Sequence, residues 1–400
     1  MSDDLAFEGL KVLDLSQGVA APYCSMLLAQ NGADVVKVEP PAPGDWSRAM
    51  GKPYDDQSAS SVILNRGKRS IAINLKDPDG VAIAKQMARD ADVVLQNYRP
   101  GVIEKFGLDY DSVAAENPTV VYLSLTGFGP VGPKAKHPAT DSVMQAYTGF
   151  MSINRDEAGS PQRIDFYAID VITGLYAFQA VSSALYRRAM KGVGKHIETS
   201  LLQSALAFQE PKMVMYELEG GESEPIGSPV GTFPTTDGHI CVNARRDPHF
   251  YALCRLLGRD ELIDDPRYTE ARSRVANRAD LLAIVAEAME TKPKADWSKE
   301  LSGVDILNAP VNDYGALFDE KQVEAVGAVR WVEHDTLGRI PMGAIAGIPE
   351  MATDNPRAHA PHIGQHSREV LVEIGKSPAE IDTLIAKGAV TEAALPRAAE

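Results

Sequence analysis

Short hydrophobic runs alternate with amphipathic stretches over the first 130 residues of the chain. Residues 11–16 and 34–39 have the pattern of β-strands, and residues 22–31 have the apolar spacing of a helix with proline in its first turn. A strand, a helix and a second strand form the repeating unit of a parallel sheet. The alternation continues with strands predicted at 69–75, 92–96 and 119–125, a turn at 77–80, and helices at 81–89 and from about 100. The pattern predicts a doubly wound α/β fold.

The clearest helix of the chain is predicted at residues 170–190, which are apolar or small on most faces. We expect it to be buried along much of its length. A strand and a helix follow at 195–209, and residues 219–229 are then rich in Gly, Pro, Ser and Glu, which is typical of a domain boundary. The tail, with a helix predicted at 368–375 and a final segment at 379–390, fits either domain on pattern alone.

Composition narrows the class of protein. The 400 residues suffice for two or three domains, and 40 Lys+Arg against 55 Asp+Glu give a net charge of −15, which disfavours nucleic acid as a partner. Cys24, Cys241 and Cys254 cannot all pair within one chain, and no Cys/His cluster suggests a metal site. The acidic start is unlike a signal peptide, and charged residues or glycine break each apolar stretch. We therefore expect a cytoplasmic protein with reduced thiols, no membrane segment and no bound metal.

Two loops offer candidate ligand sites. Residues 127–132 match the G-x-G-x-x-G dinucleotide motif, but Pro130, Pro133 and Pro138 forbid the helix that this motif requires, so we expect a surface loop. The turn at 16–22 follows the first predicted strand. It lies at the carboxyl end of that strand, where open α/β sheets bind ligands.

Asp170 stands at the start of the long predicted helix. Its most ordinary role there is an N-cap that accepts a backbone N–H. The helix N-terminus would also favour the ionised carboxylate, and a positioned carboxylate is a usable nucleophile.

Two side-chain pairs have both a chemical and an ordinary interpretation. His137 and Asp141 flank a proline-rich loop and are either an acid–base couple or solvated loop residues. Arg245 and Arg246 follow an apolar strand and either grip a substrate carboxylate or lie in an exposed turn.

Ordered sequence blocks cover nearly the whole chain and resemble the class III CoA-transferase family. That family includes formyl-CoA:oxalate and carnitine CoA-transferases and, as a divergent branch, the α-methylacyl-CoA racemases. The blocks are, in order, GLKVLDLSQGVAAPYCSMLLAQNGADVVKVEPP, GDWSR, NRGKRSIAINLKDPDG, DVVLQNYRPGVIEKFGLDY, NPTVVYLSLTGFGPVGP, DSVMQAYTG, DVITGLYAFQAVSSAL and FPTTDGHICV.

The resemblance implies a role for each matching residue. Asp170 would be the nucleophile, forming an aspartyl–acyl anhydride and then an aspartyl-CoA thioester, with Asp141 in support. Coenzyme A thioesters would be substrates, with no tightly bound cofactor and no metal. Lys76 and Lys105 would meet the CoA phosphates, and Ile73 would offer an apolar surface to adenine. By motif position the CoA site would comprise Gln17, Val19, Ala20, Ile73, Lys76, Asn97, Tyr98 and Lys105.

The resemblance also implies an interlocked homodimer. Each chain would have a Rossmann-like large domain with a parallel sheet, built from residues 1–222 and 333–400, and a smaller α+β domain at 223–332. The predicted reaction transfers CoA from an acyl-CoA donor to a small carboxylic acid. Arg245 and Arg246, as a clamp for a second carboxylate, favour succinyl-CoA and a di-acid, whereas Val19 occupies a position that is Gln in oxalate-using members.

The alternative within the same family is a 2-methylacyl-CoA racemase. In that branch a His immediately precedes the position of Asp141, and here the residue is Thr140. A racemase needs two bases across the α-carbon, so the missing imidazole disfavours this alternative.

Overall fold

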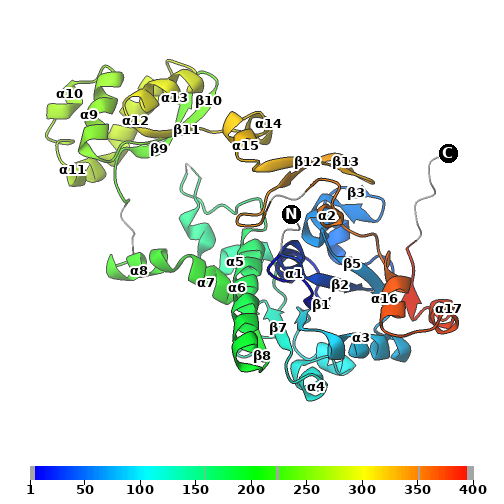
Figure 1. The fold of residues 1–400 in the computed structure, drawn as a ribbon. Helices are drawn as coiled ribbons and strands as arrows, with labels where there is room; N and C mark the ends of the chain where they lie inside the picture. Colours follow the sequence, from blue (N-terminus) through cyan, green and yellow to red (C-terminus); the bar gives the residue numbers. More distant parts are fainter. Residues whose placement is uncertain (1–4, 157, 222–224, 350–351, 394–400) are drawn as a thin grey trace. The chain divides into compact units, whose positions relative to one another are not determined.

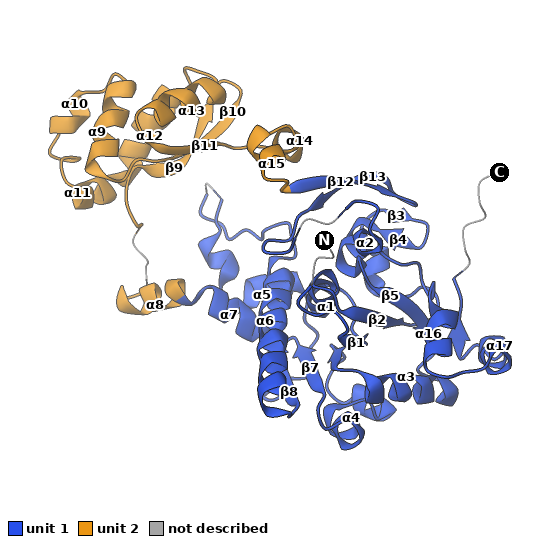
Figure 2. Cartoon of the chain, in the orientation of Figure 1, with its two compact units in different colours: residues 1–210, 329–400 blue, residues 211–328 orange. Residues whose placement is uncertain are grey.

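The structure is a computed structural model that describes residues 5–156, 158–221, 225–349 and 352–393 (Figure 1). It divides into two compact units, residues 1–210 with 329–400, and residues 211–328 (Figure 2). The predicted boundary at 222/223 and the acidic start at 1–4 lie outside the described residues. The predicted boundary at 332/333 falls inside a strand of the first unit, β12 (Val329–His334).

A seven-stranded sheet forms the centre of the first unit, in the order β14-β5-β2-β1-β6-β7-β8. All neighbouring strands from β5 to β8 are parallel, as the sequence predicted, and only the edge strand β14 is antiparallel to its neighbour. The fold is therefore α/β with a mainly parallel sheet. The strands are β1 (Lys11–Asp14), β2 (Asp34–Glu39), β5 (Arg69–Ile73), β6 (Val93–Gln96), β7 (Val121–Thr126), β8 (Lys195–Ser200) and β14 (Val390–Thr391).

Helices cover both faces of this sheet, and each face has its own apolar core. One core includes side chains of α1 and α6, and the other includes side chains of α3, α16 and α17. The helices of the first unit are α1 (Ala20–Gln30), α2 (Ala59–Asn65), α3 (Pro78–Asp90), α4 (Tyr110–Glu116), α5 (Asp141–Tyr147), α6 (Ala168–Lys191), α7 (Leu201–Phe208), α16 (Ser367–Glu373) and α17 (Pro378–Ala386). Short segments complete it: β3 (Pro53–Tyr54), β4 (Gln57–Ser58), β13 (Gly338–Gly343), η1 (Trp46–Ala49), η2 (Ile103–Phe106), η3 (Phe150–Ile153) and η4 (Pro356–Ala358).

Two local predictions were wrong. The predicted turn at 77–80 is the start of α3, because the Asp77 side chain caps the helix by accepting the N–H of Asp79. The helix predicted from about residue 100 is only the short 3₁₀ segment η2. Gly101 and Gly107 bracket this segment in left-handed backbone conformations, with φ of 88° and 58°, which end regular helix on both sides.

The tail belongs to the first unit, which decides between the two alternatives that the pattern left open. β14 pairs with β5, and the Arg69 guanidinium on β5 forms ion pairs with Glu369 at 2.8 Å and Glu373 at 2.7 Å on α16. These contacts join segments about 300 residues apart in sequence. Both chain ends therefore build the large unit.

The second unit combines an antiparallel sheet with helices, as in the smaller α+β domain that the resemblance implies. Its antiparallel sheet, β11-β10-β9, packs against helices through an apolar core that includes Phe233, Ile240, Leu253 and Trp297. Its strands are β9 (Val230–Thr235), β10 (Gly238–Asn243) and β11 (Leu307–Pro310). Its helices are α8 (Glu210–Leu218), α9 (Asp247–Leu256), α10 (Glu261–Asp264), α11 (Ala271–Ala276), α12 (Arg278–Met289), α13 (Lys294–Gly303), α14 (Tyr314–Phe318) and α15 (Lys321–Ala325).

The long helix α6 departs from two expectations. Among the described residues it is the one helix long and apolar enough to cross a membrane by length and composition, although it packs here against α1 and α7 beside the sheet. Only 39% of its most apolar 18-residue stretch is buried, so the helix is more exposed than the sequence predicted. Leu175, Tyr186 and Met190 on this helix remain exposed.

Candidate active site

The order of the strands creates a crevice between β1 and β6. From β1 the chain winds outward through β2 to β5, and from β6 it winds in the other direction through β7 to β8. Ligands of open α/β sheets bind at such a switch point, beyond the carboxyl ends of the strands. The turns after β1 and β6 meet there: the Gln17 N–H donates to Asn97 Oδ1 at 2.9 Å, and Asn97 Nδ2 donates to the Gln17 carbonyl at 2.7 Å.

A cavity of about 460 Å³ opens at this switch point. Its size is within the range of small-molecule sites. Its walls come from the turns after β1 and β6, the loop that follows β7, and the first turn of α6. Six of the predicted site residues line it together, namely Gln17, Val19, Ala20, Asn97, Tyr98 and Asp170.

Asp170 is the third residue of α6 and not its N-cap, so the N-cap interpretation was wrong. The carboxylate of Asp141 takes that role from another helix, because its Oδ2 accepts the N–H groups of Ile169 at 2.6 Å and Asp170 at 3.1 Å. The Asp170 carboxylate accepts no hydrogen bond within the described part of the chain. The Asp170 side chain is therefore not used as a helix cap and lines the cavity instead.

The protonation of Asp170 also differs from the expectation. Burial, and secondly the charge of Asp141, raise the pKa of Asp170 to about 7. The prediction that the helix N-terminus would hold this carboxylate ionised was wrong, because Asp141 already occupies the terminal amides. Near neutral pH the group exchanges between carboxylate and acid.

Gln145 fixes the orientation of Asp141, and the sequence interpretation missed it. Its fully buried side chain donates from Nε2 to Asp141 Oδ1 at 2.6 Å and to the carbonyls of Ile164 and Phe166. Its Oε1 accepts the Ile164 N–H at 2.9 Å. Because Gln145 lies one helical turn after Asp141 on α5, this spacing was the available signal.

His137 and Asp141 do not form the acid–base couple that the sequence allowed. Asp141 is nearly buried and its oxygens bond the α6 amides and Gln145, whereas His137 is exposed on a loop and lines the cavity. The loop at 127–132 leads to α5 without opening a helix there, which confirms the rejection of the dinucleotide motif. Trp46, Arg99 and Thr140 also line the cavity and were not predicted as a ligand wall.

Three of the predicted CoA residues do not line this cavity. The Ile73 side chain is 1% exposed in the sheet core, where β14 lies alongside it, so it offers no surface to adenine in this structure. Lys76 and Lys105 are exposed, Lys76 before α3 and Lys105 on η2. Arg245 and Arg246 are exposed in the second unit, just before α9.

One group of side chains in the described residues has metal-like spacing. Ligand atoms of Asp55, Asp56 and His362 lie within 4.8 Å of one another. His362 Nδ1 and Asp56 Oδ1 are 2.6 Å apart, so these two groups already satisfy each other by a hydrogen bond. The group lies outside the lining of the switch-point cavity.

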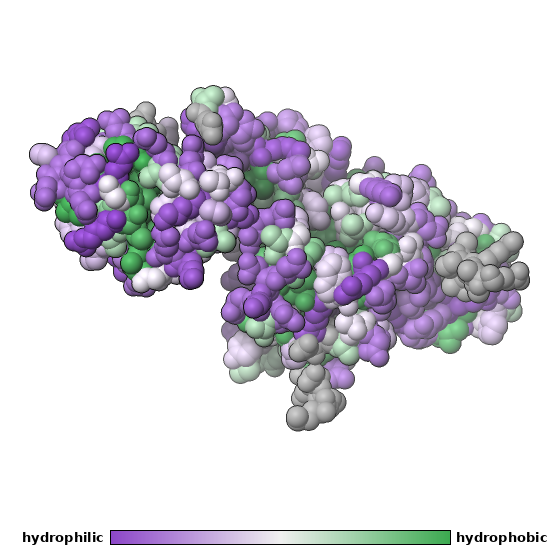
Figure 3. Space-filling view, turned by 90° about the horizontal axis from the view of Figure 1, so that it is seen from above, coloured by the Kyte–Doolittle hydropathy of each residue, from purple (hydrophilic) through white to green (hydrophobic). Residues whose placement is uncertain are grey.

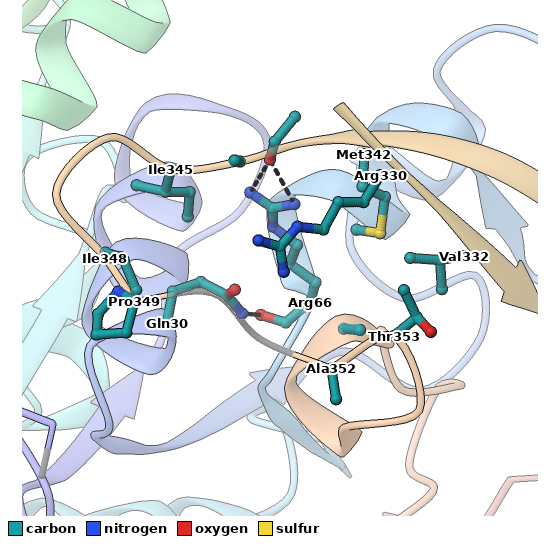
Figure 4. Close-up of a pocket in the computed structure, with 13 residues that line it drawn as sticks. Gln30, Arg66, Arg330, Val332, Met342, Ile345, Ile348, Pro349, Ala352 and Thr353 are labelled. Atoms are coloured by element: carbon teal, nitrogen blue, oxygen red, sulfur yellow. Dashed lines mark hydrogen bonds between the residues drawn. The ribbon is translucent and has the colours of Figure 1, made fainter. Parts of the chain in front are cut away.

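A smaller cavity of about 70 Å³ lies between Gln30 at the end of α1, Arg66 just after α2, and the β12–β13 hairpin with the segment that follows it (Figure 4). There the Arg66 guanidinium donates to the Gly343 carbonyl at 3.3 and 3.4 Å, and Gln30 Nε2 donates to the Arg66 carbonyl at 3.3 Å. None of the predicted catalytic or CoA residues lines this cavity. Its contacts attach the returning tail to the large unit.

Comparison with known proteins shows which proteins the whole chain resembles. Residues 7–367 match the sequence profile of CoA-transferase family III. The chain is 34% identical to human succinyl-CoA:glutarate CoA-transferase over 94% of its own length and 87% of that protein. It is 33% identical to succinyl-CoA:mesaconate CoA-transferase of Haloarcula marismortui, over 92% of this chain and 96% of that one.

The fold has a close counterpart among solved structures. The crystal structure of a CAIB/BAIF family protein from Brucella suis superposes with a TM-score of 0.82. The two sequences are 31% identical, and the match covers 92% of this chain and 99% of the other. Sequence and fold therefore agree over nearly the whole chain.

Proposed function

Because this chain belongs to CoA-transferase family III and is an acyl-CoA:carboxylate CoA-transferase, we propose that it moves CoA from succinyl-CoA to a small dicarboxylic acid. The names of the relatives support the substrate class, since both include succinyl-CoA with a di-acid, glutarate or mesaconate. The observation that carries the reaction is the position of Asp170. Its carboxylate faces the switch-point cavity while Asp141 satisfies the backbone around it.

The first half-reaction loads CoA onto Asp170. A carboxylate oxygen of Asp170 attacks the thioester carbon of the donor, the C–S bond breaks, and an aspartyl–acyl anhydride and CoA thiolate result. The thiolate then attacks the aspartyl carbonyl of the anhydride. The donor leaves as a free carboxylate, and an aspartyl-CoA thioester remains.

The second half-reaction runs the same two steps on the acceptor. The acceptor carboxylate attacks the aspartyl thioester and expels CoA thiolate, and the thiolate attacks the acceptor carbonyl of the new anhydride. The new acyl-CoA leaves and Asp170 is restored as a carboxylate. Each step exchanges an oxygen anion for a sulfur anion at an acyl carbon, so the sum needs neither ATP nor a net proton.

The environment of Asp170 serves this chemistry. Because burial and Asp141 raise its pKa to about 7, the ionised carboxylate is more basic and more nucleophilic than an ordinary aspartate. Only the ionised fraction attacks, so activity depends on deprotonation near neutral pH. Asp141 acts by positioning the first turn of α6 and by its charge, and not by contact with the thioester.

The proposed CoA site uses the residues gathered at the switch point. The paired turns that carry Gln17 and Asn97, with Val19, Ala20 and Tyr98, form a channel toward Asp170 that Arg99 also lines. The exposed amines of Lys76 and Lys105 are proposed for the CoA phosphates outside this channel. No part of this assignment needs a metal or a resident cofactor.

A second copy of the chain is the proposed partner. The surface is mainly hydrophilic with separate apolar patches (Figure 3), and α6 and α7 together expose Leu175, Tyr186, Met190 and Phe208. Apolar side chains of this size recurring along two adjacent helices are typical of an interface. Sedimentation of the purified chain should therefore give twice the mass of 43.1 kDa.

Trapping of the acyl-enzyme tests the proposed reaction. After incubation with succinyl-CoA, hydroxylamine should convert Asp170 to its hydroxamate in the wild type, as detected by peptide mass spectrometry. Asp170→Ala and Asp170→Asn should show no hydroxamate and no transfer to glutarate. Near wild-type transfer by Asp170→Ala would exclude the covalent route.

A further inference from the structure

Trp46 is an exposed aromatic residue on the wall of the switch-point cavity. It begins η1, lines the cavity and is 52% exposed. Its indole ring lies directly against the turn after β1, because a Cβ added to Gly18 would come within 1.9 Å of the ring atom Cζ2. Gly18 has a φ of +80°, so the turn and the ring both require glycine at this position.

One buried carboxylate holds both sides of this contact. Asp45 Oδ1 accepts the N–H of Gly18 at 2.8 Å and the N–H of Ser47 at 2.8 Å, which are the turn beneath the ring and the residue after Trp46. Asp45 is fully buried. Any displacement of this carboxylate therefore moves the indole and the turn together.

Lys37 holds the Asp45 carboxylate in place through an ion pair. Its ammonium group lies 2.8 Å from Asp45 Oδ2 and donates to the Ser16 carbonyl at 2.7 Å, and both charged side chains are completely buried. Burial alone would lower the pKa of Lys37, but the charges of Asp45 and Asp14 hold it above its usual value. The Lys37 ammonium therefore stays charged over the working pH range, beside the Asp45 carboxylate.

A buried ion pair is a weak source of stability, since the loss of hydration offsets most of the attraction. What this pair supplies is position. It connects β2, the turn after β1 and η1 at the wall of the cavity, within reach of residues 16–20.

We propose that Trp46 contacts the pantetheine arm of bound CoA, and that Asp45 and Lys37 are positioning residues for its indole ring. This inference rests on the proposed use of the cavity for CoA. The thioester must reach Asp170, so the arm has to cross the cavity that Trp46 lines. Pantetheine is an uncharged chain of methylenes and amides, which matches a flat apolar ring beside Val19, Ala20 and Pro100.

Intrinsic fluorescence tests the contact, because the chain has only three tryptophans. Titration with CoA and with pantetheine should each change the emission of the wild type in a saturable way, whereas adenosine 3′,5′-bisphosphate should not. Trp46→Phe should abolish the change. The matched control is Trp331→Phe, which removes a tryptophan 39% exposed on β12 and should leave the change intact.

A response to adenosine 3′,5′-bisphosphate but not to pantetheine, or a response that survives in Trp46→Phe, would overturn the contact. Calorimetric CoA binding and transfer activity of the wild type are measured in parallel. Full binding and turnover with no Trp46 signal would reject this inference alone, whereas absence of both would reject the proposed function.

Kinetics separates positioning from support of the fold. Asp45→Asn should raise the KM for the acyl-CoA donor about ten-fold or more, as expected when a hydrogen bond to a charged group is lost, with a smaller effect on kcat. Lys37→Arg keeps a positive charge beside Asp45, so it should retain most of the wild-type affinity for the acyl-CoA donor. Lys37→Met removes this charge and should not retain it. Equal losses in kcat and KM for all three variants, in proportion to lost thermal stability, would mean that the pair only supports the fold.

Discussion

Asp141 Oδ2 accepts the backbone N–H of Asp170 at 3.1 Å, so one carboxylate caps the helix that carries the other. The arrangement has two consequences for Asp170. Its side chain is released from capping, and the negative charge beside it adds to burial in raising its pKa. In the proposed mechanism Asp141 thus positions the nucleophile and raises its pKa without contacting the substrate.

The pH dependence of the reaction should follow Asp170. Only the carboxylate form attacks, so kcat/KM for the donor should rise with pH through about 7 and level off above it. Asp141→Asn removes the neighbouring charge and keeps an acceptor oxygen for the α6 amides. We expect its midpoint at lower pH but still above the usual aspartate range, because burial remains.

A nearby control checks that the shift is specific. Asp165→Asn removes a carboxylate that is 90% exposed on the loop before α6, and its pH midpoint should stay at the wild-type value. A common midpoint for all three proteins would show that Asp141 does not act on the titrating group.

Asp170 should cost the protein stability when it is ionised. The pKa of Asp170 is about 7 in the folded chain, whereas the ordinary pKa of an aspartate in an unfolded chain is 3.8, so folding opposes ionisation between these pH values. Asp170→Asn should therefore raise Tm, with a gain that grows from pH 4 to pH 7 and is then constant. At pH 8 we expect at least about 2 °C, the shift for roughly 1 kcal/mol in a domain of this size. A gain independent of pH would contradict the raised pKa.

Gly18→Ala should destabilise the chain through both the backbone and Trp46. A left-handed alanine costs about 1–2 kcal/mol, and the contact with the indole ring adds about 1–3 kcal/mol of overpacking. Gly9→Ala is the matched control, since Gly9 has a φ of +81° and nothing within 4 Å of an added Cβ. Urea unfolding should show the larger loss for Gly18→Ala, and equal losses would mean that Trp46 moves aside freely.

Arg245 and Arg246 remain the proposed clamp for the distal carboxylate of a di-acid. Arg245→Ala or Arg246→Ala should lower kcat/KM for glutarate. The loss should correspond to about 1.5–3 kcal/mol of transition-state stabilisation, the value of a hydrogen bond to a charged group. Mono-acids should be nearly unaffected, and Arg272→Ala, an exposed arginine of the same unit, serves as the control. Equal losses for mono- and di-acids would assign the two arginines to the fold or to CoA.

Racemisation should be absent. Thr140 precedes Asp141 and has no basic group, and Asp141 itself is occupied by backbone amides. In deuterium oxide a 2-methylacyl-CoA should therefore gain no α-deuterium at a rate comparable with CoA transfer, as measured by mass spectrometry. Exchange at the transfer rate would favour the racemase alternative.

The sequence by itself determined most of the local structure and the family of enzymes to which the chain belongs. The pattern of apolar and polar residues over 11–39 predicted β1, α1 and β2, because the repeat of a strand or a helix depends only on residues that are close together in the sequence. The ordered motifs placed Asp170 at the start of a long helix and the first turn at the end of a strand. Both features depend on residues that lie close to each other in the sequence.

Only the tertiary structure decided which of these residues meet. Gln17 and Asn97 are 80 positions apart and form two hydrogen bonds because β1 and β6 are neighbours in the sheet. The cap on α6 comes from Asp141, 29 positions before Asp170. The raised pKa of Asp170 follows from burial and, secondly, from the charge of Asp141. Ile73 matches a ligand position in sequence but is enclosed by the returning β14. Strand order and burial arise from packing of the whole chain, which no local pattern encodes.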